Sequence, residues 1–248
     1  NKVTELKSDA NVMSMISGSG FALEGNPVRS LYSLNFQGLN KEGLPTFINE
    51  KGELTVTDIN FQERENKSHL VYEGSTDPTI TGSFGNIFSY KGFKLNVFMT
   101  YSFGNVIRLD PVFHNAYSDL DATPREFKNR WTVAGDEKIT TVPVIADLRQ
   151  NTMNSYLNKA YNAYNYSTER IAKGDFIRMK EISVTYEFPK TMVSKLSLSN
   201  LSLKIQGTNL FLLYADKKLN GQDPEFFNSG GVAVPVPKQF TLTLRLGI

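Results

Sequence analysis

The feature that most constrains this chain is a strict alternation of apolar and polar residues near its C-terminus. Apolar residues occupy every second position there, namely Phe240, Leu242, Leu244, Leu246 and Ile248. Successive side chains of a β-strand point to opposite faces, so this pattern predicts a strand with one wholly apolar face. That face has to be buried against a second sheet or against lipid.

The same period of two recurs in three more segments, at 93–103, 182–188 and 201–208. Taken together, the four segments predict a set of candidate lipid-facing residues: Leu95, Val97, Met99, Val184, Tyr186, Leu203, Ile205, Leu242, Leu244 and Leu246. The alternate positions are mostly polar and include Lys94, Glu187, Lys204 and Arg245, with Phe98 as an apolar exception. We expect these charged residues to be solvated or structural.

Two connections between the predicted strands are short. Residues 79–90 place Ile80, Phe84, Phe88 and Tyr90 in phase, and Lys91 and Gly92 then join this segment to the next one. Two residues of this kind between alternating segments predict a tight β-hairpin. Pro189 ends the strand at 182–188, and a short helix is expected over 190–196.

Long polar stretches, at 110–167 and 215–237, form the other connections. Short turns on one side and long loops on the other are typical of outer-membrane barrels. Alternation by itself leaves two architectures open, a transmembrane β-barrel and a soluble β-sandwich, because both need strands with a period of two. No apolar stretch reaches the roughly 18 residues of a transmembrane helix.

Composition excludes several classes of function. The 27 Lys and Arg residues nearly balance the 25 Asp and Glu residues, so the net charge of +2 does not predict a nucleic-acid partner. The absence of cysteine excludes a disulfide scaffold and thiol catalysis. A mean hydropathy of -0.30 does not separate a barrel from a soluble protein, since the lumen of a barrel is polar.

Residues with catalytic or metal-binding chemistry are few and scattered. The two histidines, His69 and His114, are far apart in the sequence, and no G-x-S-x-G nucleophile motif occurs. Asp119 and Asp121 offer two carboxylates for Ca²⁺, but no EF-hand loop surrounds them. We therefore predict no catalytic residue, no metal site and no cofactor.

A cluster of tyrosine and asparagine is the most suggestive local composition. Its members are Tyr156, Tyr161, Asn162, Tyr164, Asn165 and Tyr166. Aromatic rings and amides are suited to binding a carbohydrate or a peptide, so these residues are candidates for a ligand or partner loop. The alternative is a loop that packs on itself, because both residue types are common in loops.

A series of short motifs runs in order along nearly the whole chain. They lie at 24–28 (EGNPV), 73–78 (EGSTDP), 81–86 (TGSFGN), 129–131 (NRW), 174–180 (GDFIRMK), 206–211 (QGTNLF) and 223–225 (DPE). In this order they resemble the C-terminal β-barrel portion of the SusC/RagA family of TonB-linked outer-membrane transporters. The stretch at 24–39 resembles the family's barrel segment that precedes the hairpin.

The resemblance implies an all-β fold, in which residues 1–248 supply roughly the last third of an antiparallel barrel of about 22 strands. We expect six or seven strands here, with no counterpart of the family's plug domain or N-terminal strands.

The resemblance also implies TonB-dependent import of glycans or peptides across the outer membrane, without enzymatic activity. The implied partners are a SusD-like surface lipoprotein, the remainder of the barrel with its plug, and the TonB system acting through an N-terminal segment. The regions 110–167 and 215–237 are expected to face the lipoprotein or the ligand. The alternative function is that of a soluble β-sandwich module that binds glycans without transporting them.

Overall fold

The computed structural model describes residues 2–6, 10–18, 23–113, 125–227 and 236–248. The chain forms two units, each built from two separate stretches. The first unit consists of Asn1–Asp77 and Asn105–Ala172, and the sheet unit consists of Pro78–Gly104 and Lys173–Ile248.

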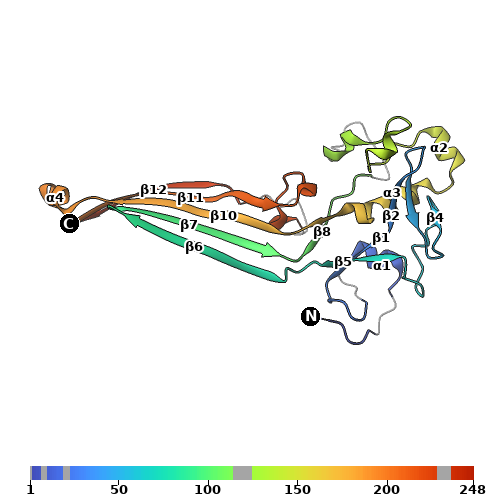
Figure 1. Ribbon diagram of the computed structural model, residues 1–248, viewed down its shortest axis with the longest axis horizontal. Coiled ribbons are helices and arrows are strands. Elements are labelled where there is room, and N and C mark those ends of the chain that lie inside the picture. The colour runs from blue at the N-terminus through green and yellow to red at the C-terminus, as the bar shows by residue number, and fades with distance from the viewer. Residues whose placement is uncertain (1, 7–9, 19–22, 114–124, 228–235) are drawn as a thin grey trace. The chain divides into compact units, whose positions relative to one another are not determined.

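The sheet unit is a five-stranded antiparallel sheet (Figure 1). Its strands are β6 (Ile80–Tyr90), β7 (Phe93–Phe103), β10 (Phe176–Glu187), β11 (Asn200–Ala215) and β12 (Gln239–Gly247), in the order β12-β11-β10-β7-β6. The shortest has nine residues and the longest 16, enough for a tilted strand to cross a bilayer. The predicted antiparallel all-β fold is confirmed.

Short turns join the strands at one end of the sheet. Tyr90 pairs with Phe93 across the predicted hairpin, and both residues of the turn have left-handed backbone, with φ of 46° at Lys91 and 86° at Gly92. A side chain at Gly92 would lie only 2.8 Å from the carbonyl oxygen of Glu187, so only glycine fits. The helical turns α4 (Lys190–Val193) and η4 (Ser194–Leu196) form the second short connection, as predicted after Pro189.

Long connections leave the sheet at its other end. Ile80 pairs with Phe103 there, and Phe176 pairs with Ala215. The connection from β7 to β10 contributes most of its length to the first unit, and the connection from β11 to β12 contains η5 (Lys217–Leu219) and η6 (Pro224–Phe226). The predicted asymmetry between short turns and long loops is therefore present.

The register brings the predicted apolar residues onto one face. One row across the sheet runs through Phe88, Leu95, Val184, Ile205 and Leu242. The remaining members of the predicted set occupy neighbouring rows of the same face because each strand keeps its period of two over this region. The alternation of polar and apolar residues thus becomes a sheet with two chemically different faces.

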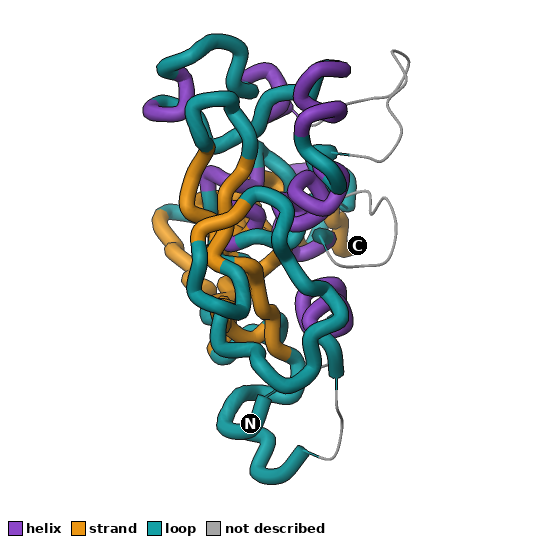
Figure 2. Tube along the Cα trace, turned by 90° about the vertical axis from the view of Figure 1, so that its right-hand side faces the viewer, coloured by secondary structure: helices purple, strands orange, loops and turns teal. Residues whose placement is uncertain are grey.

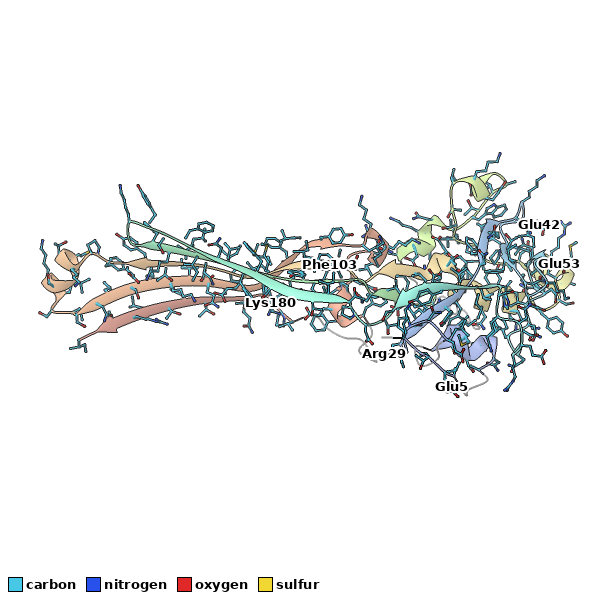
Figure 3. The ribbon with its side chains drawn as sticks, turned by 60° about the horizontal axis from the view of Figure 1, so that its bottom comes forward. Glu5, Arg29, Glu42, Glu53, Phe103 and Lys180 are labelled. Carbon is cyan, nitrogen blue, oxygen red and sulfur yellow. The ribbon has the colours of Figure 1, made fainter. Side chains whose placement is uncertain are left out.

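A bulge in β10 interrupts this alternation. Met179 pairs with Met99 and Glu181 with Phe98, so Lys180 has no partner on β7 (Figure 3 labels Lys180). An extra residue reverses the phase of a strand, since side chains alternate strictly. Residues before Lys180 consequently point to the face opposite to the one that uninterrupted alternation would give them.

Strand β11 is irregular at the matching position. The register shifts between the pairs Met179–Phe211 and Glu181–Thr208, and Asn209 adopts a left-handed φ of 53°. Asparagine tolerates this conformation better than most residues. The motif at 206–211 thus accommodates a shift in the register of β10 and β11, a role that alternation did not predict.

The first unit contains short strands and helices connected by loops (Figure 2). From its first stretch come α1 (Val12–Ser17), β1 (Ser30–Leu34), β2 (Phe36–Leu39), β3 (Pro45–Ile48), β4 (Leu54–Thr55) and β5 (Leu70–Ser75). From its second come β8 (Val106–Arg108), η1 (Arg125–Asn129), η2 (Asp136–Lys138), α2 (Leu148–Met153), α3 (Leu157–Asn165), η3 (Thr168–Arg170) and the start of β9 (Ile171–Lys173). The strands form three small sheets, β1-β5, β2-β3-β4 and β8-β9.

The core of the first unit joins its two stretches. Val12 and Leu34 from the first stretch pack in one cluster with Val112 and Tyr164 from the second. All five residues of β1 are buried. A strand buried on both faces has no face to offer to lipid, and β1 lies in the first unit and not in the long sheet. The long sheet accordingly has five strands, fewer than the six or seven expected.

Among the described residues, no helix combines the length and apolar character that crossing a membrane requires.

His69 is a buried titratable group of the first unit. Its side chain is 7% exposed, and neither ring nitrogen has a hydrogen-bond partner within the described part of the chain. Burial lowers the pKa of His69 below its usual 6.5, although Glu50 and Glu63 partly oppose this effect. The unfolded chain therefore binds a proton more readily than the folded chain as the pH falls.

We expect the first unit to lose stability as the pH falls below about 6.5, and to keep this contribution above that value. Thermal unfolding followed by fluorescence of Trp131, the chain's single tryptophan, measures the effect between pH 7.5 and 5. The His69→Gln variant removes the titrating group and should show a smaller fall. An equal fall in both proteins would contradict the assignment to His69.

Candidate functional site

The polar face of the long sheet carries charged side chains that pair across the strands. Lys94 Nζ lies 2.7 Å from Glu187 Oε1, and Asn96 Nδ2 donates to Glu181 Oε1 at 3.0 Å. Lys204 Nζ lies 3.8 Å from the same Glu181 oxygen. Ion pairs as exposed as that of Lys94 and Glu187 add little to the free energy of unfolding. The polar face of the sheet is therefore a hydrated surface.

Phe98 is the predicted exception on the polar face, and the structure accounts for it. Phe98 pairs with Gly85 on β6, and a side chain added at Gly85 would lie 3.0 Å from the Phe98 ring. The ring therefore occupies the space over a residue that has no side chain. Its position over Gly85 partly covers the apolar ring of Phe98, although Phe98 lies on the polar face.

The apolar face has large side chains exposed. Of the ten predicted lipid-facing residues, six have exposed fractions of at least 36%, namely Leu95, Val184, Ile205, Leu242, Leu244 and Leu246. Val97, Met99, Tyr186 and Leu203 are half-buried on the same face. An apolar surface that extends across several strands marks a contact with lipid or with another macromolecule.

Aromatic side chains gather where the short turns lie. The rings of Phe93 and Tyr186 are 4.5 Å apart, and those of Tyr186 and Phe188 are 4.9 Å apart. Tyr90, in the same region, is 71% exposed. Aromatic rings at the ends of membrane strands suit the boundary between lipid and water.

The tyrosine and asparagine cluster divides into surface and core residues along α3. Tyr156 precedes the helix with a left-handed φ of 66° and is 70% exposed. Asn162 is half-buried. The side chains of Tyr156 and Asn162 are therefore at least partly accessible, as the predicted ligand or partner role requires.

The other members of the cluster hold the first unit together. Tyr164 is fully buried, and Asn165 accepts hydrogen bonds from the backbone of Val112 and Phe113 while donating to the Phe113 carbonyl at 2.7 Å. Burial raises the pKa of the Tyr164 hydroxyl. For Tyr164 and Asn165, the structure supports self-packing and corrects their inclusion among ligand contacts, because neither presents a surface.

Tyr161 and Tyr166 have an intermediate position. The Tyr161 hydroxyl donates to the Val144 carbonyl at 2.7 Å. The guanidinium of Arg108 lies 5.5 Å from the centre of the Tyr166 ring, and burial lowers the pKa of Arg108 to about 10. Both tyrosines already have partners within the first unit, so a ligand role for them stays a prediction.

Sequence reasoning missed one buried charged cluster in the sheet unit. Arg178, on β10, is 6% exposed and contacts Asp223 and Glu225 of the connection between β11 and β12. Strict alternation assigns Arg178 to the apolar face, and the reversal of phase at Lys180 moves it to the polar face. The sequence did contain one sign of this cluster, because Arg178 occupies a position at which strict alternation requires an apolar residue.

Three residues considered for metal binding, His114, Asp119 and Asp121, lie outside the described residues. Within the described ranges, no group of three or more His, Cys, Asp or Glu side chains is arranged to hold a metal ion.

No family model matches the chain. Among characterised proteins, it is 27% identical over 209 residues to TonB-dependent receptor P39 of Formosa agariphila, covering 77% of this chain and 18% of that protein. It is 24% identical over 210 residues to TonB-dependent receptor P3 of the same organism, covering 82% of this chain and 19% of that protein. The chain thus spans about a fifth of the length of these relatives.

Solved structures share the fold. A chain of the RagAB peptide transporter matches with a TM-score of 0.63 and 20% identity, over 93% of this chain and 24% of that chain. The RagAB peptide importer in its 'open-open' state matches with a TM-score of 0.65 and 21% identity, over 100% of this chain and 25% of that one. In its 'closed-closed' state the TM-score is 0.64 at 21% identity, over 93% and 24% of the two chains.

These matches confirm the resemblance to the barrel portion of TonB-linked transporters of the SusC/RagA type. They also confirm the fold class.

The apolar face gives a test by charge substitution. We expect Phe240→Arg to destabilise the membrane-inserted protein by about 2–4 kcal/mol, the cost of an arginine facing lipid near the bilayer midplane. Phe240 lies on the apolar face in the row that runs through Val97, near the middle of β7. Thr241→Arg is the matched control, because Thr241 lies on the polar face of the same strand. Reversible denaturant unfolding from lipid vesicles measures both. Equal, small effects of the two substitutions would contradict a lipid-facing Phe240.

The division of the tyrosine cluster gives a second test. We expect Tyr164→Ala to cost about 3–5 kcal/mol of stability, as for other large buried aromatic residues. Tyr156→Ala should change stability by less than about 0.5 kcal/mol, since its ring is exposed. Thermal unfolding followed by Trp131 fluorescence compares the two variants. A large loss of stability in Tyr156→Ala would show that this residue, too, belongs to the core.

Proposed function

We propose that this chain forms part of the wall of a TonB-dependent outer-membrane transporter that imports glycans or peptides. The observation that carries the proposal is the long sheet with one exposed apolar face and one face of paired charges. A barrel wall needs both, since its outer side meets lipid and its inner side meets water.

The polar face fits the lining of a wide channel. Lys94 and Glu187 each keep about half of their side-chain surface exposed, so they need little desolvation in a water-filled lumen. In a barrel of about 22 strands the lumen is wide enough to require a plug. We propose that the remainder of such a barrel and its plug are partners of this chain.

The edges of the sheet support the same conclusion. Strands β6 and β12 each have one neighbour in the sheet formed by the described residues. A strand edge facing lipid leaves backbone N–H and C=O groups without hydrogen-bond partners, which hydrocarbon cannot supply. In the proposed transporter, further strands pair with β6 and β12 and close the wall.

The long connections are the proposed meeting place for partner and substrate. They leave the sheet opposite the short turns, at the end that faces the cell exterior in outer-membrane barrels. We propose that regions 110–167 and 215–237 contribute to contacts with a SusD-like surface lipoprotein or with the nutrient, with Tyr156 and Asn162 as exposed candidates. Energy would come from the TonB system through an N-terminal segment of the transporter.

The alternative, a soluble β-sandwich that binds glycans, has less support. Such a fold needs a second layer over the apolar face. The exposed fractions of Leu242 and Leu244, 68% and 58%, leave them uncovered by the described residues. The similar structures are those of a transporter, described as an importer of peptides.

The proposal is tested by deleting the gene in the source bacterium. We expect growth to fail on oligopeptides or on oligosaccharides as the only carbon source, and the substrate that fails identifies the class imported. Disruption of the TonB system should produce the same defect, and restoring the gene should reverse it. Unchanged growth on both substrates, with the protein recovered from the soluble fraction, would favour the sandwich alternative.

A further inference from the structure

Arg178 connects the polar face of the sheet to the segment that follows β11. Its Nη2 lies 2.5 Å from Asp223 Oδ1, and its Nε lies 3.2 Å from Glu225 Oε2. The side chains of Arg178 and Asp223 are 8% and 9% exposed, whereas that of Glu225 is 43% exposed. The guanidinium thus engages two carboxylates from one short segment, with the Asp223 pair buried.

The bulge at Lys180 makes this contact possible. Arg178 pairs with Thr100 on β7 and with Leu212 on β11, and Thr100 belongs to the polar face. Because the extra residue reverses the phase of β10, the arginine points to the polar face. The pairs lie toward the end of the sheet at which the long connections leave.

The segment itself is held by two aspartates that each have two roles. Asp216 begins η5 by accepting from the Lys218 amide at 2.9 Å, and it also accepts from the Lys173 amide at 2.8 Å. Asp223 begins η6 by accepting from the Glu225 amide at 3.1 Å, and it also binds Arg178. Each carboxylate therefore stabilises a helical turn and ties that turn to another segment, Asp216 to Lys173 before β10 and Asp223 to Arg178 within β10.

We propose that Arg178 and Asp223 form a latch that fixes residues 216–227 over the polar face, so that this segment lines the mouth of the channel. Arg178 and Asp223 are positioning residues in this proposal, since they act through the segment that they hold. The lining role rests on the proposed function, which makes the polar face the lumen. The latch itself rests only on the contacts described.

Arginine suits this position better than lysine. Its guanidinium donates a hydrogen bond to Asp223 through Nη2 and places Nε at ion-pair distance from Glu225, whereas the ammonium of lysine is a single point charge. Loss of either member of the buried pair leaves the other charge buried without its partner. The segment is then expected to open more often.

A cysteine reporter measures this opening in the complete protein. The chain contains no cysteine, and Leu219, which lies between the two aspartates, is 1% exposed. A Leu219→Cys variant, treated on intact cells with a membrane-impermeant maleimide, reacts only when the segment opens. The protein without the introduced cysteine gives the background of labelling.

We expect Asp223→Asn or Arg178→Met, each added to the reporter, to raise the rate of labelling at least about tenfold, because a buried pair is broken. The two changes together should raise it no further than the larger single effect, as for residues that act as one unit. Arg178→Lys should fall between the reporter and Arg178→Met. Glu187→Gln is the matched control, since it breaks the exposed pair with Lys94 and should leave the rate unchanged.

A second measurement is used if the Leu219→Cys variant fails to assemble. Trypsin cleavage after Lys217 or Lys218, followed by mass spectrometry of the C-terminal fragment, needs no cysteine, and the same variants should be cleaved faster than the unmodified protein. Equal rates of labelling and cleavage with and without Asp223→Asn would overturn the latch.

Transport separates the two proposals. If the latch opens in the variants as expected but the unmodified protein supports no uptake of peptide or oligosaccharide, the latch stands and the channel-lining role fails. If the unmodified protein supports uptake but the variants label at the rate of the reporter alone, the latch fails and the proposed function stands.

Discussion

The structure depends on one constraint, the need of every backbone N–H and C=O group in a strand for a hydrogen-bond partner. Five strands satisfy most of this need by pairing with one another in an unbroken antiparallel order. Among the described residues, the outer edges of β6 and β12, and the edge of β11 beyond Thr208, have no strand partner. In lipid, where no water can replace a missing partner, this requirement is strict, and in the proposed transporter further strands have to meet it. The register that satisfies the backbone also decides which side chains lie on the apolar face and which lie on the polar face.

The same register explains how one sheet accommodates two sequence patterns that are out of phase. Before Lys180, strand β10 has Arg178 at a position where strict alternation requires an apolar residue. After Lys180, polar and apolar residues alternate regularly. One extra residue brings both patterns into agreement, with Met179 beside Met99 and Arg178 beside Thr100. A charged residue that would otherwise lie on the apolar face instead pairs with carboxylates on the polar face. Local irregularity of the backbone therefore keeps the charge of Arg178 off the apolar face.

Much of the long sheet was predictable from sequence because its causes are local. The hairpin at Lys91 and Gly92 and the ten apolar-face residues follow from a period of two and from turn chemistry. The bulge was not predicted, since it depends on how β10 and β11 pair. The burial of β1, Tyr164 and Asn165 was missed for a similar reason. These residues pack against partners far away in the sequence, such as Val112 and Phe113, and local composition does not report such contacts.

The discontinuous first unit has a consequence for biogenesis. Its core combines Val12 and Leu34, which precede the β6–β7 hairpin in the chain, with Val112 and Tyr164, which follow it. The chain passes from one stretch to the other through the whole hairpin, and a hydrogen bond from Thr79 N to Phe103 O brings the two crossing points together. Closing that core requires contacts of high sequence separation, which are slow to form in an open chain and faster once the hairpin has joined its ends. We therefore expect pairing of β6 with β7 to precede closure of the core of the first unit and to accelerate it.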